Sequence, residues 1–314
     1  MEDMSIAANP GTVVGIDGSA DGEAALRWAV GDAKLNHQKL TLVHVVSPLV
    51  GGYSGIGMST PVWPQDLNDW RQDRGRQLLD NAAHLAHSLA GRELEIDTMM
   101  PFGAIVPALV ELSAHTDMMV LGSRGLGTFN RALLGSVSTA LAHHAHCPVV
   151  LVHADAPTLP ANAPILLGTD GSAGSLPAVE LAFREASCRN AELIVLHACS
   201  DAEVPQLTAV PWWALDSDAE HQLTQFLAPY RERYPEVAVS YHVVRDHPAR
   251  HLVEESESAQ LVVVGSRGRG GLAGMLLGSV SSTLVHATTT PVVVARRDPA
   301  RVETSPTVAT AAQS

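Results

Sequence analysis

Residues 118–152 read MMVLGSRGLGTFNRALLGSVSTALAHHAHCPVVLV, and residues 261–295 read LVVVGSRGRGGLAGMLLGSVSSTLVHATTTPVVVA. Each stretch runs from an apolar segment through a glycine-rich loop and a helical segment to a second apolar segment. Apolar runs without polar alternation are typical of parallel strands that are covered on both faces of a sheet. Recurrence of the whole pattern indicates an internal repeat, so the fold is expected twice.

The repeat extends toward the start of each half. VVGIDGSADGEAALRWA from Val13 matches LLGTDGSAGSLPAVELA from Leu166. Short β-branched runs alternate with helical stretches, which predicts an α/β fold with a doubly wound parallel sheet in each half. Strands are expected near 12–17, 40–46, 94–99, 118–122 and 148–152, and near 164–170, 192–198, 238–244, 261–265 and 291–295. We predict one domain over 1–153, a second over 164–297, and a disordered tail over 298–314.

Composition limits the possible partners. The chain has 314 residues, 46% of them hydrophobic, and a net charge of −13. This acidity argues against general nucleic-acid binding, which needs a basic face to replace phosphate counterions. The first residues lack the pattern of a signal peptide, and no apolar run approaches the roughly 18 residues that cross a bilayer. We therefore expect a cytoplasmic protein without membrane or nucleic-acid partners.

The strongest chemical signal is the spacing of glycines after the fourth strand of each half. The first copy has Gly122, Gly125 and Gly135-Ser136, and the second has Gly265, Gly268 and Gly278-Ser279. Glycines let anionic oxygens approach the backbone N–H groups, and a helix that begins at the Gly-Ser step offers unpaired N–H groups and a favourable dipole. Ser138 and Ser281 could add a second hydroxyl. This arrangement favours a nucleotide phosphate site in each half.

Other interpretations of these glycines remain open. Glycine after a strand often serves only the turn, and Gly-Ser before a helix is often only an N-cap. The loop interiors also differ between the copies, with Arg131 opposite Gly274. The chain lacks a Walker lysine motif. A dinucleotide fingerprint is excluded because it belongs after the first strand, with an acidic residue about 20 positions later.

A second candidate element follows the first strand of each half. Gly15-x-Asp17 recurs as Gly168-x-Asp170. The carboxylates could reach a nucleotide by a hydrogen bond or through a metal ion, since ligands of open α/β sheets lie where the winding reverses. Alternatively they only form an Asx-turn or an N-cap.

Two sets of basic residues leave their roles open. Arg124 and Arg267 occupy equivalent loop positions and could pair with phosphates or lie solvated on the surface. A triplet resembles a metal cluster but lies at a helix end, where cationic side chains are common: His143, His144 and His146.

The motif G-x2-G-x9-G-[ST] and the repeat over about Thr12 to Ala295 resemble the universal stress protein family in its tandem two-domain form, as found in actinobacteria. The resemblance implies five parallel strands in the order 3-2-1-4-5 in each half. It also implies ATP between the ends of strands one and four, with Val45 and Ala198 offering backbone groups to adenine. The implied nucleotide-contacting residues of the first copy are Gly15, Asp17, Val45, Gly122, Ser123, Arg124, Gly125, Leu126, Gly127, Thr128, Gly135, Ser136, Val137 and Ser138. Those of the second copy are Gly168, Asp170, Ala198, Gly265, Ser266, Arg267, Gly268, Arg269, Gly270, Gly271, Gly278, Ser279, Val280 and Ser281.

The leading functional hypothesis is a regulatory switch in stress response or growth control that binds one ATP per domain and acts on a regulatory partner protein. The alternatives are a slow Mg-dependent ATPase, an AMP-type nucleotide sensor, or a structural module without a ligand. A dedicated catalytic base is not apparent, and hydrolysis would need one, together with Mg. The last strands, CPVVLV and TPVVVA, resemble the edge through which family domains pair. The resemblance therefore implies an internal pseudo-dimer and a homodimer of chains, and the differing loops predict unequal ATP affinities.

Overall fold

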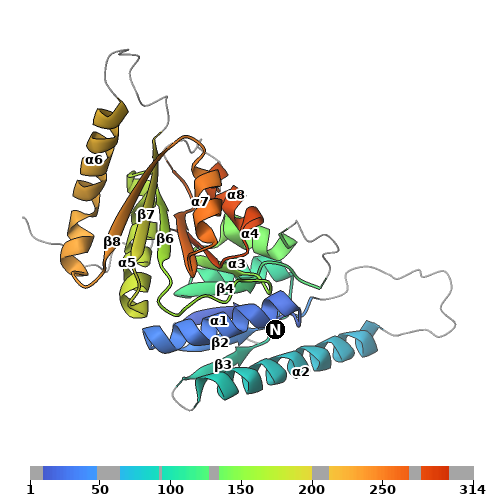
Figure 1. Cartoon of the computed structure of the whole chain (residues 1–314). Coiled ribbons are helices and arrows are strands. Elements are labelled where there is room, and N and C mark those ends of the chain that lie inside the picture. Colours follow the sequence, from blue (N-terminus) through green and yellow to red (C-terminus); the bar gives the residue numbers. More distant parts are fainter. Residues whose placement is uncertain are drawn as a thin grey trace, which may run out of the picture.

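The computed structural model describes residues 10–47, 64–91, 94–126, 134–199, 212–268 and 277–296 (Figure 1). The strands are β1 (Thr12–Gly15), β2 (Leu40–Val43), β3 (Ile96–Met99), β4 (Met118–Gly122), β5 (Val149–Val152), β6 (Ile165–Thr169), β7 (Leu193–Cys199), β8 (Val239–Arg245), β9 (Leu261–Gly265) and β10 (Val292–Ala295). The helices are α1 (Ala20–Asn36), α2 (Pro64–Ala90), α3 (Ile105–Ser113), α4 (Ser136–His144), α5 (Leu176–Arg189), α6 (Trp212–Arg233), α7 (Pro248–Ser256) and α8 (Ser279–Ala287), with a short 3-10 helix η1 (Ala173–Ser175) before α5. The tail expected to be disordered lies outside the described residues.

Each half has the expected strand order. The first half runs β3-β2-β1-β4-β5 and the second β8-β7-β6-β9-β10, and the pairs within each half are parallel. Numbered within each half, both orders are 3-2-1-4-5. The α/β class is therefore confirmed.

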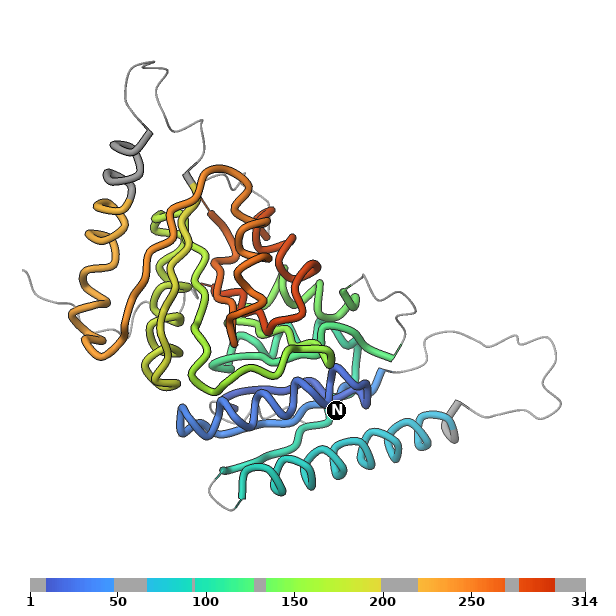
Figure 2. Tube along the Cα trace, in the orientation of Figure 1, coloured from blue at the N-terminus to red at the C-terminus, as the bar shows by residue number. Residues whose placement is uncertain are grey.

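The expectation of two separate sheets needs a correction, because the halves share one ten-stranded sheet. β5 and β10 pair antiparallel, with Val293 opposite Val150. Both are edge strands of their halves, and an uncovered edge presents unpaired N–H and C=O groups that a second edge can satisfy. Figure 2 shows the two halves, blue to green and yellow-green to red, lying beside each other. The internal pairing through the last strands is the one that the resemblance implied.

Helices cover both faces of this sheet. The core on one face includes Leu26 of α1, Leu79 of α2, Phe183 of α5 and Leu227 of α6. The core on the other face holds buried residues of the remaining four α-helices: Leu109 of α3, Leu141 of α4, Leu252 of α7 and Leu284 of α8. This layering explains why central strands such as β4, β5, β9 and β10 are apolar and buried, whereas the outer strands β3 and β8 carry polar residues and are partly exposed.

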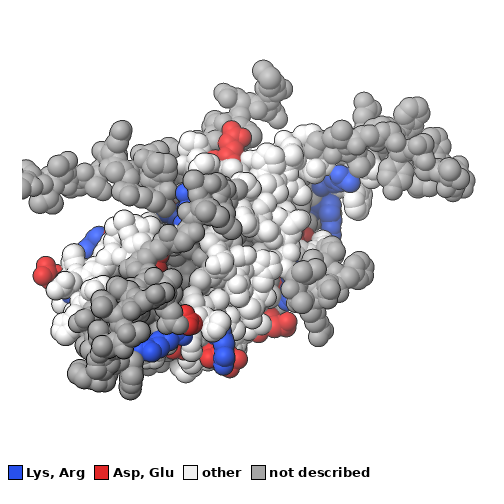
Figure 3. Space-filling model, turned by 90° about the horizontal axis from the view of Figure 1, so that it is seen from above, with Lys and Arg blue, Asp and Glu red and all other residues white. Residues whose placement is uncertain are grey.

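Surface charge is mixed on the face that Figure 3 shows. Lys and Arg alternate there with Asp and Glu, and the described part of this face carries no broad positive field. Across the described chain, the helices all fall short of the length and apolar character that spanning a bilayer requires.

A buried ionic cluster joins α1 to α5 across the two halves. The carboxylates of Asp32 and Glu185 are each 1% exposed. Arg189 donates hydrogen bonds to both, at 2.5 Å to Asp32 Oδ1 and 3.2 Å to Glu185 Oε2. Burial, followed by the charge of Glu185, raises the pKa of Asp32 to about 8. Arg189 hydrogen-bonds both carboxylates and the partly exposed Arg184 pairs with Glu185 at 3.3 Å, but burial and the charge of Glu185 outweigh these cations and favour the protonated form of Asp32.

Asp32→Asn should flatten the pH dependence of stability. Between the usual pKa of 3.8 and about 8, the folded chain keeps a proton that the unfolded chain has lost. The free energy of unfolding therefore falls as pH rises through this window, by at most about 1.4 kcal/mol per pH unit, and levels off above it. Melting temperatures at pH 5 to 9 measure this slope. The exposed Glu23→Gln serves as control, and an equal slope in Asp32→Asn and the parent would contradict the assignment.

Candidate functional site

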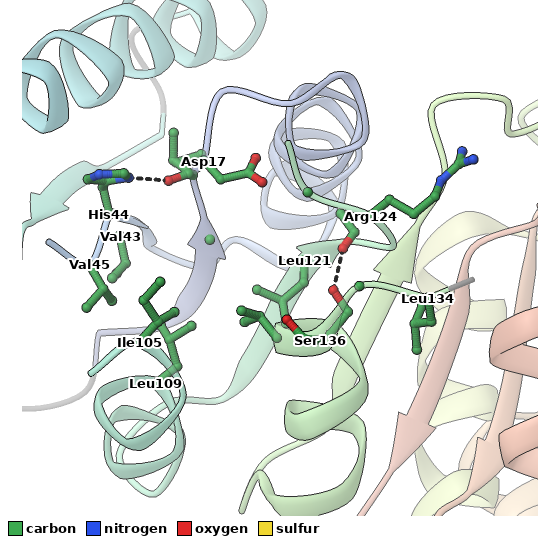
Figure 4. A pocket seen from close by; sticks show the side chains of 17 residues that line it. Asp17, Val43, His44, Val45, Ile105, Leu109, Leu121, Arg124, Leu134 and Ser136 are labelled. Atoms are coloured by element: carbon green, nitrogen blue, oxygen red, sulfur yellow. Dashed lines mark hydrogen bonds between the residues drawn. The ribbon is translucent and has the colours of Figure 1, made fainter. Parts of the chain in front are cut away.

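A pocket of about 530 Å³ lies at the carboxyl ends of β1 and β4 (Figure 4). Its lining residues are Gly15, Ile16, Asp17, Val43, His44, Val45, Ile105, Leu109, Leu121, Gly122, Arg124, Gly125, Leu134, Gly135, Ser136, Val137 and Ser138. The chain winds in opposite directions from β1 and from β4, and ligands of open α/β sheets bind at this kind of switch point. The sequence motifs of the first half therefore meet in one cavity.

The polar end of the pocket is formed by the start of α4. Gly135 is the N-cap residue, and no side chain caps this helix. Its own N–H donates to Ser123 O at 2.8 Å, which folds the loop back over the end of β4. The exposed Ser136 begins the helix and lines the pocket. Uncapped N–H groups at a helix start favour an anion.

Close approach to backbone atoms requires glycine at position 122, whereas at Gly125 the nearest atom belongs to the side chain of Asp17. A Cβ on Gly122 would lie 2.6 Å from the carbonyl carbon of Asp21 and from the amide nitrogen of Gly22. A Cβ on Gly125 would lie 2.8 Å from Asp17 Oδ2. The loop therefore packs directly on the start of α1, and Asp17 faces the glycine loop as predicted from the order of strands.

Asp17 has a local structural role as well as a place in the pocket. Its Oδ1 accepts hydrogen bonds from the Ser19 N–H at 2.9 Å and the Ser19 hydroxyl at 2.6 Å. Ser19 Oγ in turn accepts from the N–H of Gly22, as the N-cap of α1. The Asx-turn interpretation therefore holds for one carboxylate oxygen, while the residue still lines the cavity.

The guanidinium of Arg124 is held by Asp21, at 2.9 Å from Nε to Oδ2. Burial works to raise the pKa of Asp21, but hydrogen bonds from Arg124, Ser123 and the N–H of Ala154 outweigh it and hold that pKa below its usual value. Burial also lowers the pKa of His153, whose Nδ1 lies 3.2 Å from Arg124 Nη2. This cluster ties the loop to the end of β5, so the structure places the Arg124 guanidinium in an ion pair.

The apolar end of the pocket was only partly foreseen. Ile105 and Leu109 of α3 and Leu121 of β4 line it beside the expected Val45. The available signal was the short run IVPAL after the third strand, a pattern that is equally typical of a helix that only packs on the sheet. His44, also in the lining, is fixed by a 2.6 Å hydrogen bond between its Nδ1 and Ile16 O. An apolar wall opposite a helix start is the composition typical of small-molecule sites.

The remaining candidates of the first half have varied positions. Ser123 is buried and donates to Asp21 Oδ2 at 2.6 Å. The buried Ser138 donates to Gly122 O at 2.7 Å, so its hydroxyl stabilises the strand end. Val137 lines the pocket, whereas Leu126 is 76% exposed. Gly127 and Thr128 lie outside the described residues.

The second half repeats the same contacts where it is described. Asp170 Oδ1 accepts from the N–H and hydroxyl of Ser172 at 3.0 and 2.7 Å. A Cβ on Gly268 would lie 2.8 Å from Asp170 Oδ2. Gly278 is the N-cap of α8 and donates to Ser266 O at 2.8 Å. The structure therefore brings Asp170 and the second glycine loop together as it does in the first half.

The other second-half candidates have varied positions. Gly168 lies in β6 and Ala198 in β7, at the carboxyl ends of these strands. Ser279 and Val280 form the first turn of α8, as Ser136 and Val137 do in α4. The hydroxyl of Ser281 donates to Gly265 O at 2.5 Å. Arg267 lines a different pocket, described below, and Arg269, Gly270 and Gly271 lie outside the described residues.

Comparisons with known proteins identify the family of the chain. The family model described as the universal stress protein family matches residues 12–153 and 162–296. The chain is 47% identical over 291 residues to universal stress protein Rv2005c of Mycobacterium tuberculosis, covering 91% of this chain and 97% of the relative. Universal stress protein Rv2623 of the same species is also 47% identical, covering 91% of this chain and 96% of the relative.

A solved structure shows the same fold at lower identity. The crystal structure of a universal stress protein from Archaeoglobus fulgidus aligns with a TM-score of 0.69 at 20% identity. The alignment covers 92% of this chain and 98% of that chain. With two family segments in tandem and relatives matched along nearly their whole length, the chain belongs to the universal stress protein family.

Proposed function

We propose that the pocket of the first half binds ATP and that the equivalent residues of the second half bind a second ATP. Adenine would contact the apolar wall near Val45 and Ile105. The phosphates would lie against the loop from Gly122 to Gly125 and the start of α4 at Ser136. Asp17 would lie on the ribose side.

One observation carries this proposal: an apolar wall and an uncapped helix start share one cavity. Its volume of about 530 Å³ falls within the range of about 300–1,000 Å³ typical of ligand pockets. Leu109 and Leu121 supply apolar surface for a base, and Gly135 and Ser136 begin the helix that would receive phosphates. A side chain in place of Gly125 would project onto Asp17, so a small residue keeps this cradle open.

We further propose that the output is regulatory and that hydrolysis is slow or absent. Phosphoryl transfer to water needs a group that orients the water and cations that neutralise the developing charge. Among the described lining residues Asp17 is the only carboxylate, and its Oδ1 already accepts two hydrogen bonds from Ser19. The Arg124 guanidinium is paired with Asp21. Mg²⁺, if it accompanies ATP, would be bound mainly by the phosphates, with Asp17 as the nearest protein oxygen donor.

The same proposal covers location and assembly. A regulatory ATP-binding protein is expected in the cytoplasm, where ATP is available, with a partner protein that senses the bound state. A homodimer would have to use a surface other than β5 and β10, because these strands already pair with each other.

The experiment combines mass spectrometry of the nucleotide that co-purifies with the full chain and incubation of the chain with ATP and Mg²⁺. Bound ATP that persists for hours is the expected result. Rapid release of ADP would replace the switch with an ATPase. Bound AMP without uptake of ATP would favour the sensor, and a chain that takes up no nucleotide would contradict all three.

A further inference from the structure

A second pocket lies where the two halves meet. Its volume is about 720 Å³, and it is lined by the carboxyl end of α4 and by the start of the loop after β9. The lining includes two arginines and three histidines: Arg267, Arg296, His143, His144 and His146. The described lining residues include no Asp or Glu. Burial lowers the pKa of His143, so the positive charge of this pocket is argued from its two arginines. In a chain with a net charge of −13, a pocket lined by two arginines marks a place for an anion.

The repeat supplies an internal comparison for this pocket. Arg267 occupies the position of Arg124, since each is the second residue after the glycine that ends β9 or β4. Arg296 likewise occupies the position of His153. Matching backbone hydrogen bonds support this equivalence of positions. The N–H of Ser123 donates to Val152 O at 2.8 Å, and the N–H of Ser266 donates to Ala295 O at 2.9 Å.

The decisive difference is at the start of the first helix of each half. Asp21 of the first half corresponds to Gly174 of the second. In the first half the Asp21 carboxylate accepts hydrogen bonds from Arg124, Ser123 and Ala154. In the second half the same position has no side chain, and Gly174 lines the pocket. The first half therefore shows that a carboxylate, with its two anionic oxygens, fits beside the arginine at this position.

At these equivalent positions, the second half has one more cation and one fewer anion than the first half. In the first half Arg124 pairs with Asp21, and burial lowers the pKa of His153. In the second half both equivalent positions are arginines. Burial, together with the charge of Arg267, lowers the pKa of Arg296 to about 10. Arg267 is exposed and Arg296 is half-buried, and both line the cavity. Two guanidiniums at one cavity match the charge of a doubly negative oxyanion.

The pocket also joins the two halves. Arg296 at the end of β10 donates a hydrogen bond to Ala142 O of α4, which belongs to the first half. The histidines come from the last turn of α4 and from the residues that follow it. A ligand here would touch both halves, unlike a nucleotide in the pocket between β1 and β4.

We propose that this junction pocket binds a phosphoryl dianion, either free phosphate or the phosphate of a small molecule, between Arg267 and Arg296. The anion takes the place that the Asp21 carboxylate has in the first half. Planar guanidiniums bind phosphate oxygens through paired N–H donors, which makes them better suited to this group than lysines would be. The volume of about 720 Å³ leaves room for more than the phosphate alone.

The test is to restore the carboxylate. A Cβ on Gly174 would lie 3.4 Å from Ser172 Oγ and 3.7 Å from Arg267 O, which is ordinary contact, so the position accepts a side chain. Gly174→Asp should weaken binding of inorganic phosphate by at least about tenfold, because its carboxylate competes for the arginines. Gly174→Ala, which adds bulk without charge, is the matched control and should bind within about threefold of the parent. Isothermal titration of the full chain at low ionic strength measures both.

Three further measurements keep the result interpretable. Gly174→Asp should melt above Gly174→Ala in phosphate-free buffer, since its carboxylate pairs with the arginines. Arg296→Gln should also weaken phosphate binding by at least about tenfold. Parallel titrations with phenyl phosphate identify the source: tighter binding of the ester indicates a phosphorylated small molecule, and tighter binding of phosphate indicates the free ion. Equal phosphate affinity in Gly174→Asp and Gly174→Ala, or no phosphate binding by the parent, would overturn the proposal.

Discussion

Ser136→Glu is expected to weaken ATP binding in the first half by at least about tenfold, or about 1.4 kcal/mol. Ser136 is exposed at the start of α4 and lines the pocket where the phosphates would lie. A carboxylate there repels phosphate and occupies the helix N–H groups that phosphate would use. The substitution should leave the fold intact, because an acidic residue in the first turn of a helix interacts favourably with the helix dipole.

The repeat offers matched controls for this variant. Ser136→Gln is as large as Ser136→Glu but neutral, and should retain most of the affinity. Ser279→Glu makes the same change in the second half at the start of α8. Each single Glu variant should lose one ATP per chain by equilibrium dialysis, and the double variant both. If Ser136→Gln and Ser136→Glu lose affinity equally, then charge at the helix start is not the cause, and the phosphate assignment fails.

Gly122→Ala is expected to destabilise the first half by about 3 kcal/mol, the upper range for overpacking. The added Cβ would lie 2.6 Å from two backbone atoms at the start of α1, and backbone atoms there cannot rotate away as a side chain could. Gly265→Ala is the same change in the second half, where the nearest atom is Arg267 O at 3.1 Å. It should cost about 1 kcal/mol.

Denaturant unfolding of both alanine variants measures this difference. Gly122→Ala should unfold at a clearly lower denaturant concentration than Gly265→Ala. Equal midpoints would mean that the close packing of the first loop on α1 does not make Gly122→Ala more destabilising than Gly265→Ala. The comparison also shows why Gly122→Ala is a poor probe of nucleotide binding: loss of affinity there could reflect loss of fold.

Much of the fold could be predicted from the sequence because its signals are local. Apolar runs such as MMVL and LVVV predicted β4 and β9 without ambiguity. The glycine loops and Asp17 could be placed at one crevice because parallel strands end at the same edge. Joining of the two sheets through β5 and β10 was implied by the family resemblance but could not be derived from pattern, since any apolar edge strand has the same appearance.

Side-chain pairing was harder to predict, because it depends on contacts between distant segments. Arg124 and Asp21 are separated by 103 positions, and either could have faced solvent. Ile105 and Leu109 of α3 line the same pocket as Leu121 of β4, which is distant from Ile105 in the sequence. The aligned repeats show Gly174 at the position of Asp21. The sequence alone does not indicate an anion site there, because only the structure shows that Arg267 and Arg296 line one cavity.

The most direct measurement is the number of ATP molecules bound per full chain, determined by equilibrium dialysis with labelled ATP on the parent protein and on the Ser136→Glu, Ser279→Glu double variant. The account predicts two ATP per chain in the parent, in two phases if the affinities differ, and none in the double variant. A parent that binds no ATP, or a double variant that binds as the parent does, would contradict it.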